Sequence, residues 1–197
     1  MTRTKNARLA GFMFLFYIAT GIAGMIFLRG AGGAGRANYA LLMMMNPFVL
    51  AVAIYALTRD YDRDLALLAF VCRIAEGVMA GVGALFTRMQ LALTTSGDTA
   101  SAAAVAAAIA SAQRLLPLLG ATSFAIGSTI YCWLFLRARS IPSWMAWLGL
   151  LGSALLVVAL PIQIAGLLGG PPAMLIWIPM AVFEIAFALW LLIKGTA

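Results

Sequence analysis

Long apolar stretches separated by short polar clusters run along the whole sequence. A helix of about 20 residues crosses the roughly 30 Å hydrocarbon core of a bilayer, because each residue advances about 1.5 Å. We therefore predict an all-α polytopic membrane helix bundle, a single transmembrane domain covering residues 1–197. Its six transmembrane helices are expected at approximately residues 9–28, 39–57, 65–86, 115–136, 144–168 and 174–193.

The breaks between these spans carry charge, glycine or proline. Arg59–Asp64 is too polar to remain in lipid, and Arg137–Arg139 with the following Pro142 ends the fourth span. Glycines separate the first two spans, and Gly169–Pro172 forms a turn before the last. A signal peptide is the alternative for the first stretch. That stretch exceeds the usual apolar core of roughly 7–15 residues, so we expect an uncleaved helix.

Residues 96–113, between spans three and four, are rich in alanine, the strongest helix former. Asp98 or Thr99 can cap such a helix. We predict an extra alanine-rich helix here, which either lies along the outer surface or extends span four outward. Its low complexity favours a linker over a site of chemistry.

Composition agrees with a lipid environment. The chain is 64% hydrophobic and 10% charged, whereas soluble domains are about 45–50% apolar and about 25% charged. The expected partner is the lipid bilayer. A net charge of +7 could suggest nucleic acid. We predict no nucleic-acid partner, because the basic residues flank apolar stretches and are not interleaved with aromatic residues on a polar face.

The basic residues also predict orientation. Eight flank the spans on the side of the N-terminus and four on the other side, and Arg73 completes the total of 13. By the positive-inside rule both termini are expected in the cytoplasm. The eight are Arg3, Lys5, Arg8, Arg59, Arg63, Arg137, Arg139 and Lys194; the four are Arg29, Arg36, Arg88 and Arg114.

The sequence contains no histidine, which excludes histidine-ligated metals, Ser–His or Cys–His nucleophile pairs and histidine proton relays. Its two cysteines, Cys72 and Cys132, lie inside apolar stretches and form no CxxC motif. We accordingly predict no metal, no cofactor and no catalytic residue.

Three ionisable residues lie well inside predicted spans, namely Arg73, Glu76 and Glu184. Each charge costs roughly 2.5–3.5 kcal/mol at mid-bilayer, so these residues must be paired or hydrated. Arg73 and Glu76 share a helix face, and both glutamates lie roughly 14–16 Å from the cytoplasmic side. We predict that spans three and six face each other and share this polar cluster, with Gly77 and Gly81 supporting their contact.

One arginine cannot fully compensate two carboxylates, so one glutamate is expected to hold a proton. The cluster then suits either an inert ion network or a functional pathway. Asn46 beside Pro47, and Gln163 near Pro161, are possible pocket-lining residues because proline kinks can open space in a helix bundle.

Several short motifs together resemble the DUF4386 family. They are Arg8-Leu9-Ala10-Gly11, Arg73-Ile74-Ala75-Glu76, Pro142–Gly149 with Gly152, and finally Pro179, Glu184 and Trp190–Gly195. The resemblance implies a bacterial multi-pass protein of the inner (cytoplasmic) membrane, and it assigns no activity.

The leading functional prediction is an integral membrane protein whose intramembrane polar pocket binds or passes a small molecule, lipid or proton. The alternatives are a lipid-modifying enzyme that uses the buried carboxylates, and a non-catalytic membrane subunit or sensor. No nucleophile, metal or phosphate-binding motif supports an enzyme. The oligomeric state and the ligand stay open.

Overall fold

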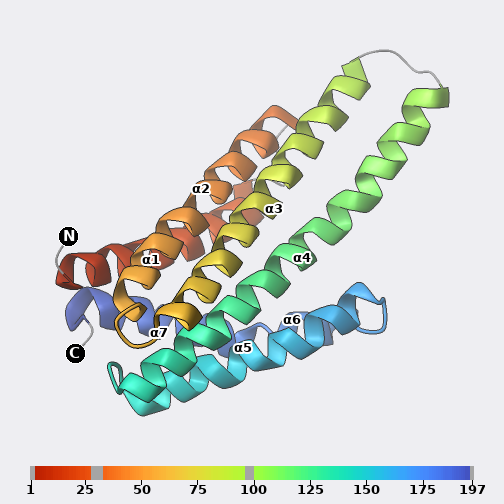
Figure 1. The fold of residues 1–197 in the computed structure, drawn as a ribbon. Coiled ribbons are helices and arrows are strands. Elements are labelled where there is room, and N and C mark those ends of the chain that lie inside the picture. The colour runs from red at the N-terminus through yellow and green to blue at the C-terminus, as the bar shows by residue number, and fades with distance from the viewer. Residues whose placement is uncertain (1–2, 28–32, 96–99, 196–197) are drawn as a thin grey trace.

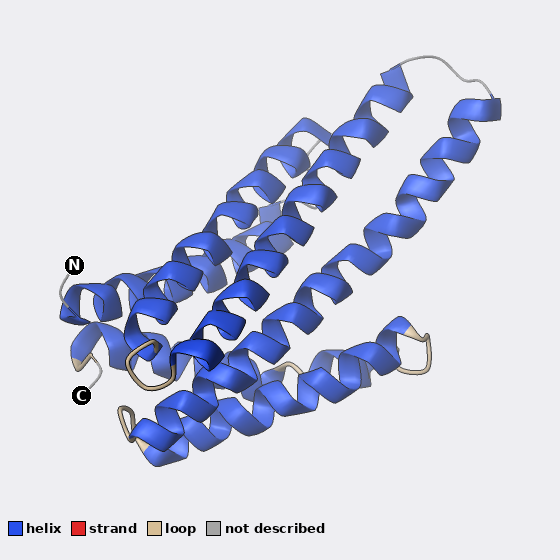
Figure 2. Ribbon diagram, in the orientation of Figure 1, coloured by secondary structure: helices blue, strands red, loops and turns tan. Residues whose placement is uncertain are grey.

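A computed structural model describes residues 3–27, 33–95 and 100–195. Within these ranges the regular structure is entirely helical, which confirms the predicted all-α class (Figure 2). Six segments are long and apolar enough to cross a membrane, counted over the same ranges. They are α1 (Arg3–Phe27), α2 (Gly33–Thr58), α3 (Arg63–Thr95), α4 (Ala100–Ala138), α5 (Ser143–Ile164), and α6 (Gly170–Leu175) together with α7 (Ile178–Ile193) (Figure 1).

Helices that follow each other in the chain also pack against each other. α1 packs on α2, α2 on α3, α3 on α4, α4 on α5 and α5 on α7, and α7 returns to α1. Short connections make consecutive helices antiparallel. The six spans therefore form a closed ring, and both chain ends lie at the same end of the bundle (Figure 1).

From Ala100 onward the alanine-rich stretch is helical, and it extends the fourth span outward as the first part of α4. α4 has 39 residues and α3 has 33, or about 58 and 50 Å of helix, which exceeds the roughly 30 Å of a hydrocarbon core. Their joined ends project past the neighbouring end of α2 (Figure 1). The predicted capping residues Asp98 and Thr99 lie outside the described residues.

The last span is divided into two helices. Pro179 has no backbone N–H, so it cannot bond to the carbonyl of Leu175 as a continuous helix would require. α6 accordingly ends at Leu175, and α7 begins at Ile178 with the proline in its first turn. Trp177, between the two helices, reaches the bundle interior.

α5 ends at Ile164 rather than near Leu168. Gly166 has a φ of 75°, a left-handed conformation that glycine adopts without a steric penalty. Its N–H donates to the Gln163 carbonyl at 3.0 Å, and the Leu167 N–H donates to the Ile162 carbonyl at 3.1 Å. This pair of bonds is the Schellman arrangement that terminates helices.

Aromatic side chains fill the interior on the side of the chain ends. Phe187 contacts Phe183 and Phe135 with ring centroids 5.2 Å apart, and Phe14 at 5.6 Å. All four rings are fully buried. This aromatic layer fills the interior of the ring of helices near the chain ends.

Small residues bring some helix backbones close together. A Cβ atom added at Gly11 would lie 2.7 Å from the Ala188 carbonyl oxygen, so α1 and α7 touch through their backbones. Gly152 likewise meets the backbone of Met180, which joins α5 to α7.

The predicted role of Gly77 and Gly81 is wrong. Both glycines lie against α2, where Phe48 and Met44 occupy the space that a Cβ would need. α3 packs between α2 and α4, whereas α7 packs between α1 and α5. Spans three and six therefore lie across the bundle from each other and are linked by long side chains.

Candidate functional site

The three predicted cluster residues lie together. Arg73 Nη1 donates to Glu76 Oε2 at 2.8 Å, and Arg73 Nη2 is 4.0 Å from Glu184 Oε1. Arg73 is 1% exposed, and the two glutamates are 7% and 8% exposed. The guanidinium thus joins α3 to α7 through an ion pair on each side.

Aromatic rings surround the rest of the Arg73 guanidinium. Its central carbon lies 4.5 Å from the Phe124 ring centroid, 5.6 Å from that of Phe14 and 5.8 Å from that of Tyr131. The electron-rich faces of these rings attract a cation and offset part of its desolvation. Nη2 also donates to the Tyr131 hydroxyl at 3.4 Å, and that hydroxyl donates to Ser128 Oγ at 3.0 Å.

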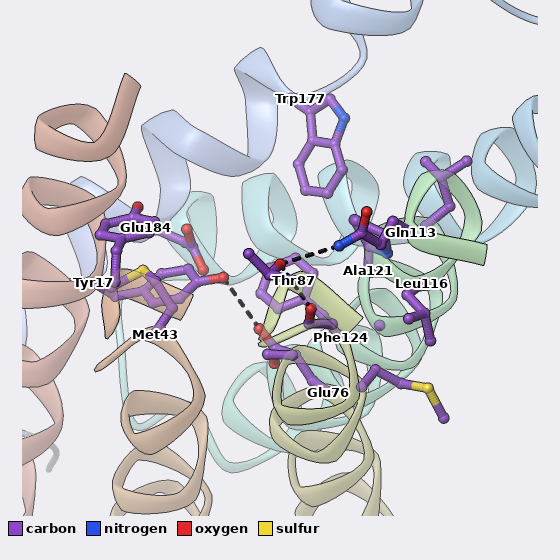
Figure 3. A pocket seen from close by; sticks show the side chains of 17 residues that line it. Tyr17, Met43, Glu76, Thr87, Gln113, Leu116, Ala121, Phe124, Trp177 and Glu184 are labelled. Atoms are coloured by element: carbon purple, nitrogen blue, oxygen red, sulfur yellow. Dashed lines mark hydrogen bonds between the residues drawn. The ribbon is translucent and has the colours of Figure 1, made fainter. Parts of the chain in front are cut away.

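The two carboxylates differ in their hydrogen bonds. Glu76 accepts from Arg73 at one oxygen and from the Tyr17 hydroxyl at the other, the latter at 3.4 Å (Figure 3). Glu184 Oε1 is buried and has no hydrogen-bond donor. Arg73 therefore supplies a hydrogen bond to Glu76 and none to Glu184. The Glu184 carboxylate can accept a further hydrogen bond.

A cavity of about 780 Å³ adjoins this cluster, on the side away from the chain ends. Its walls come from α1, α2, α3, α4, α7 and Trp177, and both glutamates line it (Figure 3). Arg73 is not among its lining residues. Toward the far end, Gln113 Nε2 donates to Thr87 Oγ1 at 3.1 Å and links α4 to α3 (Figure 3).

A second cavity of about 520 Å³ lies between α1 and α2 and shares Tyr17, Tyr39, Met43 and Glu184 with the first. Ile22 also lines it and is 55% exposed. The second cavity therefore reaches the outer surface of the bundle, and the Glu184 carboxylate borders both spaces.

Asn46 and Gln163 lie elsewhere. Asn46 Nδ2 donates to the Met13 carbonyl at 2.9 Å, which ties α2 to α1. Gln163 is half-buried near the end of α5, and its Oε1 has no hydrogen-bond partner. Neither residue lines the two cavities described above. A ligand contact for them stays a prediction.

Three residues of the site were not predicted from the sequence. Tyr17 of α1 donates to Glu76 of α3 and lines the cavity. Tyr131 and Trp177 were not singled out. Depth along the spans gives only a partial indication of Tyr131, because Tyr131 lies six residues from Arg137 whereas Arg73 lies ten residues from Arg63. Trp177 gave no comparable signal beyond its position next to Pro179.

Across the part of the chain that the structure describes, no three Cys, Asp or Glu side chains come close enough to hold a metal ion. Cys72 and Cys132 are free thiols, half-buried and buried respectively. The chemistry that this site offers is therefore that of an ion pair, two carboxylates and aromatic faces.

A family model described as a domain of unknown function, DUF4386, matches residues 31–195. The chain belongs to the DUF4386 family. The part matched to DUF4386 includes Arg73, Glu76 and Glu184, whereas Arg8–Gly11 precedes it. No curated protein and no solved structure matches the chain. With its six apolar spans, this DUF4386 protein is a multi-pass integral membrane protein.

Proposed function

We propose that this DUF4386 protein binds or passes a small molecule, lipid or proton through the larger cavity. The observation that carries the proposal is that a space of about 780 Å³ contains both intramembrane carboxylates. Cavities that hold drug-sized ligands measure about 300–1,000 Å³. A ligand in this cavity would contact Glu76 and Glu184 directly.

A purely structural ion network needs no adjoining space. Buried charges serve stability best when neighbouring side chains pack against them and satisfy every polar atom. Here the guanidinium is packed by aromatic rings, while both carboxylates border the cavity and Glu184 lacks a donor. This asymmetry favours a site that exchanges ligands or protons, as intramembrane ionisable residues commonly do.

Native mass spectrometry of protein released gently from membranes tests the proposal with Gly83→Leu. Gly83 lines the cavity, and a Cβ added there meets no atom within 4 Å. Leucine is therefore expected to fill the space without straining the helix. We expect a bound species in the wild-type protein whose occupancy falls by about tenfold in the variant, equivalent to about 1.4 kcal/mol.

Val78→Leu is the matched control, because Val78 is exposed on the same helix and does not line the cavity. It is expected to leave the bound species unchanged. Equal occupancy in all three proteins, or no bound species in any of them, would count against a binding cavity.

We also propose that the protein resides in a bacterial inner membrane with both termini in the cytoplasm, on the charge distribution described above. Alkaline phosphatase fused after residue 197 is expected to be inactive, and green fluorescent protein at the same position fluorescent. Fusions after residue 98 should give the opposite pattern. Active phosphatase at residue 197 would reverse the proposed orientation.

A further inference from the structure

We propose that the larger cavity takes a hydrophobic primary amine in its protonated form, with the ammonium group at Glu184. This inference rests on the proposed function and specifies the ligand class of the same site. It follows from the charge of the lining, the position of Arg73, the unused acceptor on Glu184 and the character of the walls.

The lining of the larger cavity carries negative charge alone. Among its described lining residues, Glu76 and Glu184 are the acidic side chains, and none is Lys or Arg. Arg73 lies behind the two carboxylates and is covered by Phe14, Phe124 and Tyr131. A ligand therefore meets two carboxyl groups that share a single guanidinium, and a bound cation takes the place of the proton that one glutamate is otherwise expected to hold. An anionic ligand would meet repulsion in a low-dielectric site.

The hydrogen bonds indicate where the positive charge would sit. Glu76 is bonded at both oxygens. Glu184 Oε1 lacks a hydrogen-bond donor, but it is buried and faces Arg73 Nη2 at 4.0 Å, so a ligand in the cavity meets the other oxygen of this carboxylate. A charged donor at that oxygen would supply the hydrogen bond that Arg73 does not give to Glu184. An ammonium with N–H groups can donate to this carboxylate, and a quaternary ammonium cannot.

The remaining walls suit an apolar body attached to that cation. Tyr17, Tyr39 and Trp177 line the cavity together with Met43 and Leu116. Aromatic faces attract cations, and the apolar side chains remove hydrocarbon from water. The volume accommodates a ligand considerably larger than a metal ion or a water molecule.

Four probes with one carbon skeleton test the inference. They are protonated 4-phenylbutylamine, its trimethylammonium analogue, 4-phenylbutanol and 4-phenylbutanoate. Binding is measured calorimetrically to protein in phosphatidylcholine nanodiscs, with empty nanodiscs subtracted. The amine is expected to bind about tenfold more tightly than the alcohol, because a charge-assisted hydrogen bond contributes about that factor. The trimethylammonium probe should be weaker than the amine, and the carboxylate should show no saturable binding.

Glu184→Gln is expected to weaken amine binding by about tenfold and to leave alcohol binding unchanged. Asp64→Asn is the control, because Asp64 is exposed in the first turn of α3, at the end of that helix away from the cavity. The wild-type series needs no variant, so a folding defect cannot obscure the result.

Equal binding of all four probes, together with its loss in Gly83→Leu, would overturn the amine inference and keep the proposed cavity. Saturable binding of the carboxylate in preference to the amine would overturn the inference as well. If none of the four probes binds, the amine inference is overturned as well. A bound native species in mass spectrometry would then still support the cavity as a binding site.

Discussion

Replacing Arg73 with methionine is expected to lower the free energy of unfolding by about 3–5 kcal/mol, the usual cost of breaking a buried ion pair from one side. Arg73 is 1% exposed, and its guanidinium is the cation that lies between Glu76 and Glu184. Methionine fills much of the same volume, but it leaves both carboxylates without their counter-ion. Unfolding of the purified protein in mixed micelles, titrated with a denaturing detergent, measures the change.

Two further variants show whether charge or packing causes this loss of stability. Arg88→Met removes an exposed arginine that donates to Asn38, and it should change stability by less than about 1 kcal/mol. The triple variant Arg73→Met, Glu76→Gln, Glu184→Gln should recover a large part of the loss, because no buried charge is left unpaired. If the triple variant is as unstable as Arg73→Met alone, packing rather than charge explains the role of Arg73.

Gly11→Ala and Gly21→Ala are expected to change stability in opposite directions, although both glycines lie in α1. The Cβ at residue 11 would lie 2.7 Å from the Ala188 carbonyl oxygen, so α1 and α7 must separate. Overpacking of this kind costs about 1–3 kcal/mol. The Cβ at residue 21 meets nothing within 4 Å, and alanine there should stabilise the helix by about 0.5–1 kcal/mol.

The same detergent titration compares the two alanine variants. Since the substitution and the helix are identical, differences in helix propensity cancel, and the contrast reports the contact that closes the ring of helices between α1 and α7. Equal effects of the two substitutions would mean that this close contact contributes nothing to stability.

Much of the site could be inferred from helix geometry. Glu76 and Glu184 were placed at similar depths by counting residues from the ends of their spans, and Arg73 was placed on the Glu76 face by a spacing of three. The distances of 2.8 and 4.0 Å from Arg73 to the two carboxylates agree with that reasoning. Because a helix rises by a fixed length per residue, the depth of a residue in the membrane can be counted from the sequence alone.

The direction in which each helix faces could not be inferred in this way. In water a polar face marks the outside of a helix, but in lipid both the outer and the inner face are apolar. Leu68 and Val71 of α3 are exposed, while Leu134 of α4 is fully buried, and nothing in their residue types separates them. The assignment of Gly77 and Gly81 to the wrong neighbour has this origin.

The sequence by itself determined the number of spans, their breaks and the depth of the buried charges, because these follow from hydrophobic length, turn residues and the helical rise. Only the tertiary structure decided that α7 closes the ring on α1, that aromatic rings cover Arg73, and that Glu76 and Glu184 border a cavity. Those features depend on how side chains from distant spans fit together, which a uniformly apolar pattern leaves undetermined.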